Sequence, residues 1–214
     1  ASTSTSFGKV YECLEAITGG SSPPISVVST TPKWVEVSPV NKWSMFDTLR
    51  DTETVAESGN ITVVIKPNTR INSLVFLNMT NITTISVVGI DRNGFTVYSP
   101  SLIFNPGINY VLTDIPLIRS MQLTIVLNGT CTIGIGSLVV GKYEYLGEVQ
   151  RGLEVNSLNF SSVTRDIYGN ANLVARRSVP KLDKTLFVEA QYITNIVKVR
   201  DALNATPAVW IGMN

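Results

Sequence analysis

The stretch Val40-Asn-Lys-Trp-Ser-Met-Phe-Asp47 places three large apolar side chains, Trp43, Met45 and Phe46, within four positions. The chain of 214 residues contains only three tryptophans and four methionines. Such a concentration of apolar volume predicts a plug that fills the core at the mouth of a sheet domain, with the charged ends of the stretch in water. The alternative is that Trp43 is exposed and serves as a platform on which a ligand stacks.

Charged residues are scarce in this chain. They make up 15% of the sequence, against about 25% in an average soluble protein, and the mean hydropathy is +0.21. A surface with so few charges predicts large areas buried against partners, including further copies of the chain. The 17 basic and 16 acidic residues give a net charge of +1. Because the basic residues are scattered, nucleic-acid binding is not expected.

The sequence shows no catalytic signature. It contains no histidine, so the commonest general base and metal ligand are absent. Neither a Gly-x-Gly-x-x-Gly motif nor a P-loop occurs. Glu144 with Glu148, or Asp47 with Asp51 and Glu53, could form a carboxylate pair for glycoside hydrolysis, but solvated surface is the favoured interpretation. We therefore expect no enzyme activity, no cofactor and no metal.

Two further features bear on where the chain is found. No run of about 18 apolar residues is present, and the first residues do not resemble a signal peptide, so we expect a soluble protein without membrane insertion. Cys13 and Cys131 could form one disulfide, but two buried free thiols are favoured at this low cysteine content.

Residues 1–39 are expected to form an N-terminal extended arm. The first six residues are predicted to be unstructured, and Lys9–Ile17 has the spacing of a short helix or a docking arm. The segments Ile25–Ser29 and Trp34–Val37 resemble strands, and the prolines that bound them suit edges or extended arms. An arm of this kind could add a strand to a neighbouring subunit.

Residues 40–141 are expected to form an antiparallel β-sandwich of jelly-roll type, because short strand-like segments alternate with turns and no long helix intervenes. Asn93-Gly94 predicts a hairpin between Ile82–Asp91 and Phe95–Tyr98. Asn128-Gly129 predicts a second hairpin, between Met121–Leu127 and Thr130–Gly141.

Residues 142–214 are expected to form a small α+β module. A hairpin is predicted around Gly169-Asn170, a helix near 192–204, and a final strand over Ala208–Ile211. A module of about 70 residues is small for independent stability, so we expect it to rest on another surface.

Five residues are candidates for contacts with a glycan or with a neighbouring subunit. Aromatic rings can stack on sugars, and arginines at an edge strand can pair with acids of another subunit, although an exposed arginine pair is equally ordinary surface. The candidates are Trp34, Trp43, Tyr98, Arg176 and Arg177.

Several short segments stand out between about residue 34 and the end of the sequence: Asn41–Asp47, Ile133–Gly141, Asn159-Phe-Ser-Ser, Asp166-Ile-Tyr-Gly169, Arg176-Arg177 and Ala205–Gly212. In their order and spacing, these segments together resemble a family of tail proteins from tailed bacteriophages. The resemblance implies a galactose-binding-like β-sandwich followed by a small C-terminal module, in a virion protein often described as carbohydrate-binding. No sugar-binding residues can be carried over, and fold alone does not fix function.

These observations lead us to expect a structural protein of a phage tail, present in multiple copies around the tail tube or at the tail tip. It would be made in the host bacterial cytoplasm and located in the virion, with itself and other tail proteins as partners. The alternative is a receptor-binding module that recognises host surface glycan through its aromatic residues.

Overall fold

The computed structural model describes residues 3–6, 8–15, 32–48, 52–149, 154–165, 168, 170–174, 178–183, 185–203 and 207–211. The chain is mainly β, with several antiparallel sheets and a short helix near the C-terminus. It forms two compact units, Ala1–Tyr143 and Glu144–Asn214. This architecture confirms the predicted fold class of a β-sandwich with a small C-terminal α+β module.

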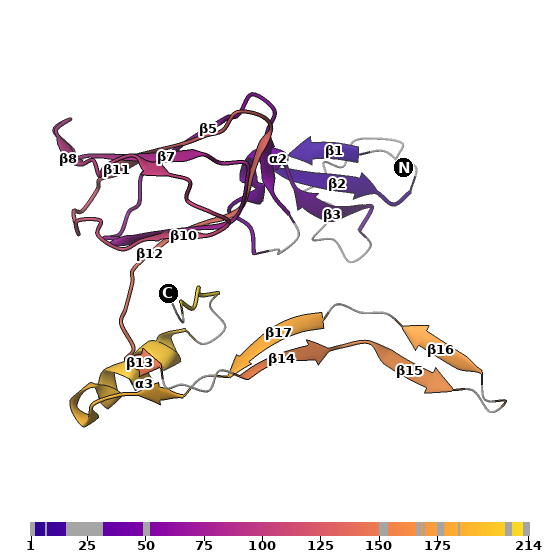
Figure 1. Ribbon diagram of the computed structural model, residues 1–214. Coiled ribbons are helices and arrows are strands. Elements are labelled where there is room, and N and C mark those ends of the chain that lie inside the picture. The colour runs from indigo at the N-terminus through magenta and orange to yellow at the C-terminus, as the bar shows by residue number, and fades with distance from the viewer. Residues whose placement is uncertain are drawn as a thin grey trace. The chain divides into compact units, whose positions relative to one another are not determined.

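Two antiparallel sheets of the first unit face each other (Figure 1). One has the strand order β10 (Tyr110–Leu112), β6 (Ser73–Thr80), β12 (Ile133–Gly141), β4 (Thr54–Ala56). The other has the order β5 (Asn60–Ile65), β11 (Gln122–Asn128), β7 (Thr84–Ile90), β8 (Thr96–Tyr98), and β9 (Ile103–Phe104) also pairs with β7. The chain crosses between the sheets from β4 to β5, from β5 to β6 and from β6 to β7. This is the topology of a jelly roll.

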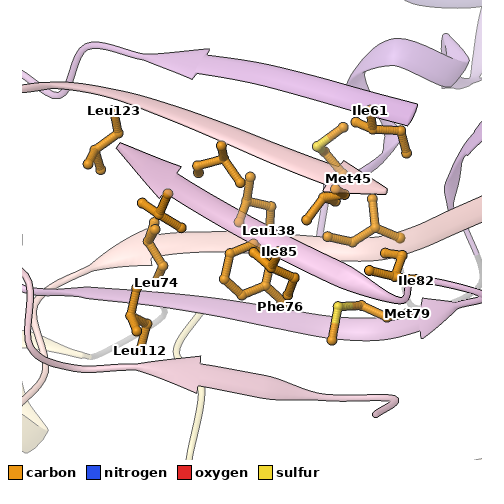
Figure 2. Packing of buried hydrophobic residues seen from close by; sticks show 14 of the residues in the cluster. Met45, Ile61, Leu74, Phe76, Met79, Ile82, Ile85, Leu112, Leu123 and Leu138 are labelled. Atoms are coloured by element: carbon orange, nitrogen blue, oxygen red, sulfur yellow. The ribbon is translucent and has the colours of Figure 1, made fainter. Parts of the chain in front are cut away.

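The core lies between the two sheets. Side chains of β7 and β11 alternate between buried and half-buried along their whole length, as strands with one inward face must. In register, Leu127 pairs with Ile85 and Ile125 with Val87, so both strands turn apolar residues to the same side. Phe76 of the opposite sheet is fully buried against them (Figure 2). This shared inward face fixes the register of the sheet.

Only one of the two predicted hairpins of the sandwich forms. β7 pairs with β8 across the turn at Asn93-Gly94, as expected. The prediction of a hairpin across Asn128-Gly129 is wrong. Strand β11 pairs with β5 and β7, whereas β12 pairs with β6 and β4. Since β11 already has a partner on each edge, the chain after Asn128 crosses to the other sheet.

The stretch that begins at Val40 forms the short helix α2 (Asn41–Ser44) and a following turn. Met45 is 3% exposed and belongs to the core, so it is a plug as predicted. Trp43 is 50% exposed and Phe46 40% exposed, and for these two the plug prediction is wrong. One helical turn cannot direct three neighbouring side chains into the same core, because successive residues on a helix point about 100° apart.

The first residues form a separate three-stranded sheet, β1 (Thr3–Ser6), β2 (Lys9–Cys13) and β3 (Trp34–Pro39), beside α2 (Figure 1). The helix alternative for Lys9–Ile17 is therefore wrong over β2, and residues 3–6 are not unstructured. A few apolar residues satisfy the helical and the strand period alike, and pairing with two neighbours decides for the strand. The strand predicted at Ile25–Ser29 lies outside the described residues.

The two cysteines are free thiols, as favoured, but they are not buried. Cys13 is half-buried at the end of β2, and Cys131 is exposed in the crossing between β11 and β12. The expectation of burial is therefore wrong for both side chains.

Among its described residues, the second unit contains three nested antiparallel strand pairs, shown in orange to yellow-orange in Figure 1. They are β13 (Glu148–Val149) with β18 (Leu186–Phe187), β14 (Glu154–Asn159) with β17 (Ser178–Asp183), and β15 (Ser162–Arg165) with β16 (Ala171–Val174). We call these six strands the ribbon. The antiparallel pairing of β15 with β16 confirms the predicted hairpin around Gly169-Asn170.

A short helical segment follows the ribbon. The 3-10 turn η1 (Ala190–Tyr192) leads into α3 (Ile193–Ala202), which confirms the predicted helix near 192–204. The strand predicted for Ala208–Ile211 is wrong, because these residues have no regular structure. A single short apolar segment forms a strand only when a neighbouring edge pairs with it.

Candidate functional site

The exposed aromatic pair of Trp43 and Phe46 is held in place by hydrogen bonds around α2. Asn41 Nδ2 donates to the carbonyl oxygen of Val55 at 2.8 Å, and the backbone N–H of Val55 donates to Asn41 Oδ1 at 2.7 Å. Thr54 Oγ1 accepts from the backbone N–H of Met45 at 2.9 Å and donates to the carbonyl oxygen of Asn41 at 2.7 Å. These four bonds fix α2 to strand β4 of the sandwich.

The rings of Trp43 and Phe46 have centroids 6.0 Å apart, with their planes inclined at 51°. The indole of Trp43 also lies against Gly8, where a Cβ would stand 2.8 Å from Trp43 Cδ1. Both rings still expose a large part of their surface to solvent. Exposed aromatic surface of this kind can stack on the apolar face of a sugar or on a side chain of a partner.

The structure does not bring the candidate residues together. Trp34 is half-buried at the start of β3, and its indole Nε1 is buried with no hydrogen-bond partner among the described residues. Trp43 follows the opposite end of that strand, and β8, which carries Tyr98, lies at the end of the sandwich remote from α2 (Figure 1). Arg176 and Arg177 lie outside the described residues. No single site uses all of the candidates that the structure describes.

The hydroxyl of Tyr98 is bonded to an acid. Its Oη donates to Asp114 Oδ1 at 2.7 Å. Partial burial, together with this hydrogen bond and the charge of the carboxylate, raises the pKa of Tyr98 above its ordinary value. The raised pKa extends to higher pH the range over which the phenol donates this bond between β8 and the loop that carries Asp114.

The carboxylate of Asp91, at the turn that leads into β8, is bonded within its own turn. The sequence at Asp91-Arg-Asn-Gly94 leads into β8, and Asp91 Oδ1 accepts from the backbone N–H groups of Asn93 and Phe95 at 2.8 and 2.9 Å. The carboxylate thus closes its own turn. Within the described ranges, no three acids or cysteines cluster in a way that could hold a metal ion.

No known protein family and no curated protein matches this chain. In the part of the chain that the structure describes, no helix is long and apolar enough to cross a membrane.

The ribbon exposes apolar side chains that sequence reasoning missed. Val163 and Leu173 are register partners, so they lie on the same face, and they are 62% and 71% exposed. Phe160 and Phe187 are also exposed. Two strand-like segments on either side of the turn at Gly169-Asn170 were the available signal in the sequence.

Proposed function

We propose that this protein is a non-enzymatic structural component of a bacteriophage tail, assembled in multiple copies around the tail tube or at the tail tip. The observation that carries the proposal is the ribbon of the second unit. Among the described residues its strands pair only two by two, and the side chains of Val163, Leu173 and Phe187 are exposed. An isolated two-stranded hairpin is at best marginally stable in water, so such a ribbon calls for a covering partner.

The energetic argument follows from the pair Val163 and Leu173. Burial of an exposed aliphatic side chain of this size contributes about 1.5–3 kcal/mol. A partner that covers this face of the ribbon would bury both side chains. The free energy of their burial would stabilise the complex and, with it, the neighbouring strand pairs. Copies of the chain and other tail proteins are the partners proposed here, and the virion tail is the proposed location.

Two features of the sequence support the phage-tail role in particular. The low charge content and the positive mean hydropathy fit a protein that buries much of its surface in an assembly. The segments that resemble phage tail proteins, including Asn41–Asp47, supply the specific link to a tail.

The experiment compares two variants of the full chain. Val163→Ser with Leu173→Ser removes the exposed apolar pair, and Leu117→Ser, at a side chain 50% exposed in the first unit, is the matched control. We expect the ribbon variant to fold normally but to lose assembly in sedimentation and incorporation into particles, whereas the control behaves as the unaltered protein. Tens of copies per purified virion by gel densitometry would support a structural role. Normal assembly of the ribbon variant would contradict it.

A receptor-binding module for host surface glycan is the second candidate. The half-exposed pair of Trp43 and Phe46 favours it, because one indole face is fixed against Gly8 while part of the ring remains accessible. The test is binding of Trp43→Ala to a glycan array beside the unaltered protein. Loss of a glycan signal without loss of stability would support this role, and a few copies at the tail tip would agree with it.

A further inference from the structure

Strand β5 (Asn60–Ile65) forms an open edge of the five-stranded sheet. It pairs along its whole length with β11. On its other side, no strand of the described residues pairs with it. Its backbone N–H and C=O groups on that side therefore form a row that can accept another strand.

The other edges of the sandwich are short or interrupted. β4 and β10 have three residues each. The edge beside β7 is split into β8, of three residues, and β9, of two, with Pro100 between them. Short strands and proline are common means by which proteins prevent pairing at an edge. Three of the four edges are thus protected.

β5 has none of these protections. Its six residues, Asn-Ile-Thr-Val-Val-Ile, include no charge, proline or glycine. Val64 is 55% exposed on the outer face. On the inner face Ile61 is buried, but Val63 and Ile65 are only partly buried against the core. A further strand beside β5 would complete their burial.

We propose that two copies of the chain pair through β5, antiparallel and centred on Val63, so that the five-stranded sheets of the two copies become continuous. In this register Ile61 lies opposite Ile65 of the second copy on the inner face, and Thr62 lies opposite Val64 on the outer face. The same side chains meet in both halves of the contact, as twofold symmetry requires.

Charge agrees with a second copy as the occupant. The nearest charged residue is Lys66, which in this register lies opposite Asn60 of the second copy and not opposite another lysine. Because like charges opposite each other destabilise strand pairs, a self-pairing strand must avoid them, and β5 does. The main-chain hydrogen bonds of the added strand supply affinity, and the inner-face residues supply specificity.

This inference rests on the proposed function only in that both require self-association. It concerns other residues, in the other unit. All chains in its test therefore carry Val163→Ser and Leu173→Ser, which removes association through the ribbon. A negative result for pairing through β5 then does not bear on the proposed association through the ribbon, and a negative result for the ribbon does not bear on pairing through β5.

The test uses two charge variants at the exposed positions 62 and 64. Thr62→Lys with Val64→Lys places like charges opposite each other twice in the proposed register. Thr62→Lys with Val64→Glu places opposite charges opposite each other twice. Both change the same two side chains, so the second variant is the matched control, and circular dichroism and thermal unfolding check that each chain folds.

Sedimentation velocity over a range of concentrations measures the dimer. We expect the chain without charge changes to dimerise, the Lys/Lys variant to dimerise at least about tenfold more weakly, and the Lys/Glu variant to dimerise at low salt and less at high salt. A chain without charge changes that stays monomeric overturns the proposal, even if another protein fills the edge. Equal behaviour of the two variants, associated or dissociated, also overturns it.

Discussion

Trp43 lies directly over Gly8: a Cβ at position 8 would stand 2.8 Å from Cδ1 and 3.1 Å from Nε1 of the indole. Gly8 has a φ of +76°, a conformation that other residues adopt only with strain. The backbone N–H of Val40 also donates to the carbonyl oxygen of Gly8 at 2.9 Å. The indole of Trp43 thus packs on the turn between β1 and β2 and is not enclosed by the core of the sandwich.

Because Trp43 packs on Gly8 and Met45 lies in the core, their substitutions should affect stability differently. Met45→Ala removes a side chain that is 3% exposed within the core, and we expect a loss of about 2–5 kcal/mol in the free energy of unfolding. Trp43→Ala removes a ring that is 50% exposed, and we expect a clearly smaller loss. Denaturant unfolding of both variants gives the comparison. A larger loss for Trp43→Ala would mean that the tryptophan is the plug.

Thr54→Val tests the attachment of α2 to β4. Thr54 is 5% exposed. Its hydroxyl accepts a hydrogen bond from the backbone N–H of Met45 and donates one to the carbonyl oxygen of Asn41. Valine keeps the shape but leaves both backbone groups unpaired, so we expect a loss of about 1–3 kcal/mol. Thr113→Val, at an exposed position, is the control, and thermal unfolding measures both. Equal stabilities would show that water replaces the hydroxyl at no cost.

Gly129→Ala tests the crossing between the two sheets. A Cβ there would overlap the carbonyl oxygen of Asn81 and the side chain of Ile133. Backbone cannot move aside cheaply, so we expect a loss of about 1–3 kcal/mol. At Gly141 no atom lies within 4 Å of the added Cβ, and Gly141→Ala should be near neutral. Chemical unfolding of the two variants decides, and a neutral Gly129→Ala would contradict this packing.

The pKa of Tyr98 gives a pH dependence with a definite sign. Its folded value is raised above the ordinary 10.0, so the folded state holds the proton more tightly than the unfolded state. The resulting stabilisation is complete below pH 10.0 and is lost as the pH rises through the higher folded pKa. In an absorbance titration of tyrosinate, we expect one late-titrating phenol that disappears in Tyr98→Phe. A titration unchanged by Tyr98→Phe would contradict the raised pKa.

Deletion of residues 1–33 tests whether the sandwich needs the N-terminal sheet. The deletion removes β1, β2 and Gly8, on which Trp43 packs, but the residues of the hydrophobic core cluster begin at Met45. We expect the truncated sandwich to remain folded by circular dichroism and to lose incorporation into particles. An unfolded product would show that β1 and β2 support the sandwich, and normal incorporation would show that they are dispensable for assembly.

The sequence alone determined much of the sandwich. The alternation of apolar residues along β7 and β11 predicts strands with one inward face, because side chains in a strand point to opposite sides in turn. The Asn93-Gly94 turn predicts its hairpin, because those two residues accept the backbone angles of a tight turn. The spacing of apolar residues near the C-terminus likewise predicts α3.

Only the tertiary structure decided between outcomes that the local patterns leave equal. Asn128-Gly129 has the same turn residues as Asn93-Gly94, yet β12 joins the other sheet because β11 has a partner on each edge. Trp43 and Met45 are equally apolar in sequence, but only Met45 reaches the core, because the helical turn of α2 points them in different directions. Alternation, turn propensity and hydrophobicity are properties of neighbouring residues, whereas pairing and burial depend on residues far apart in the chain.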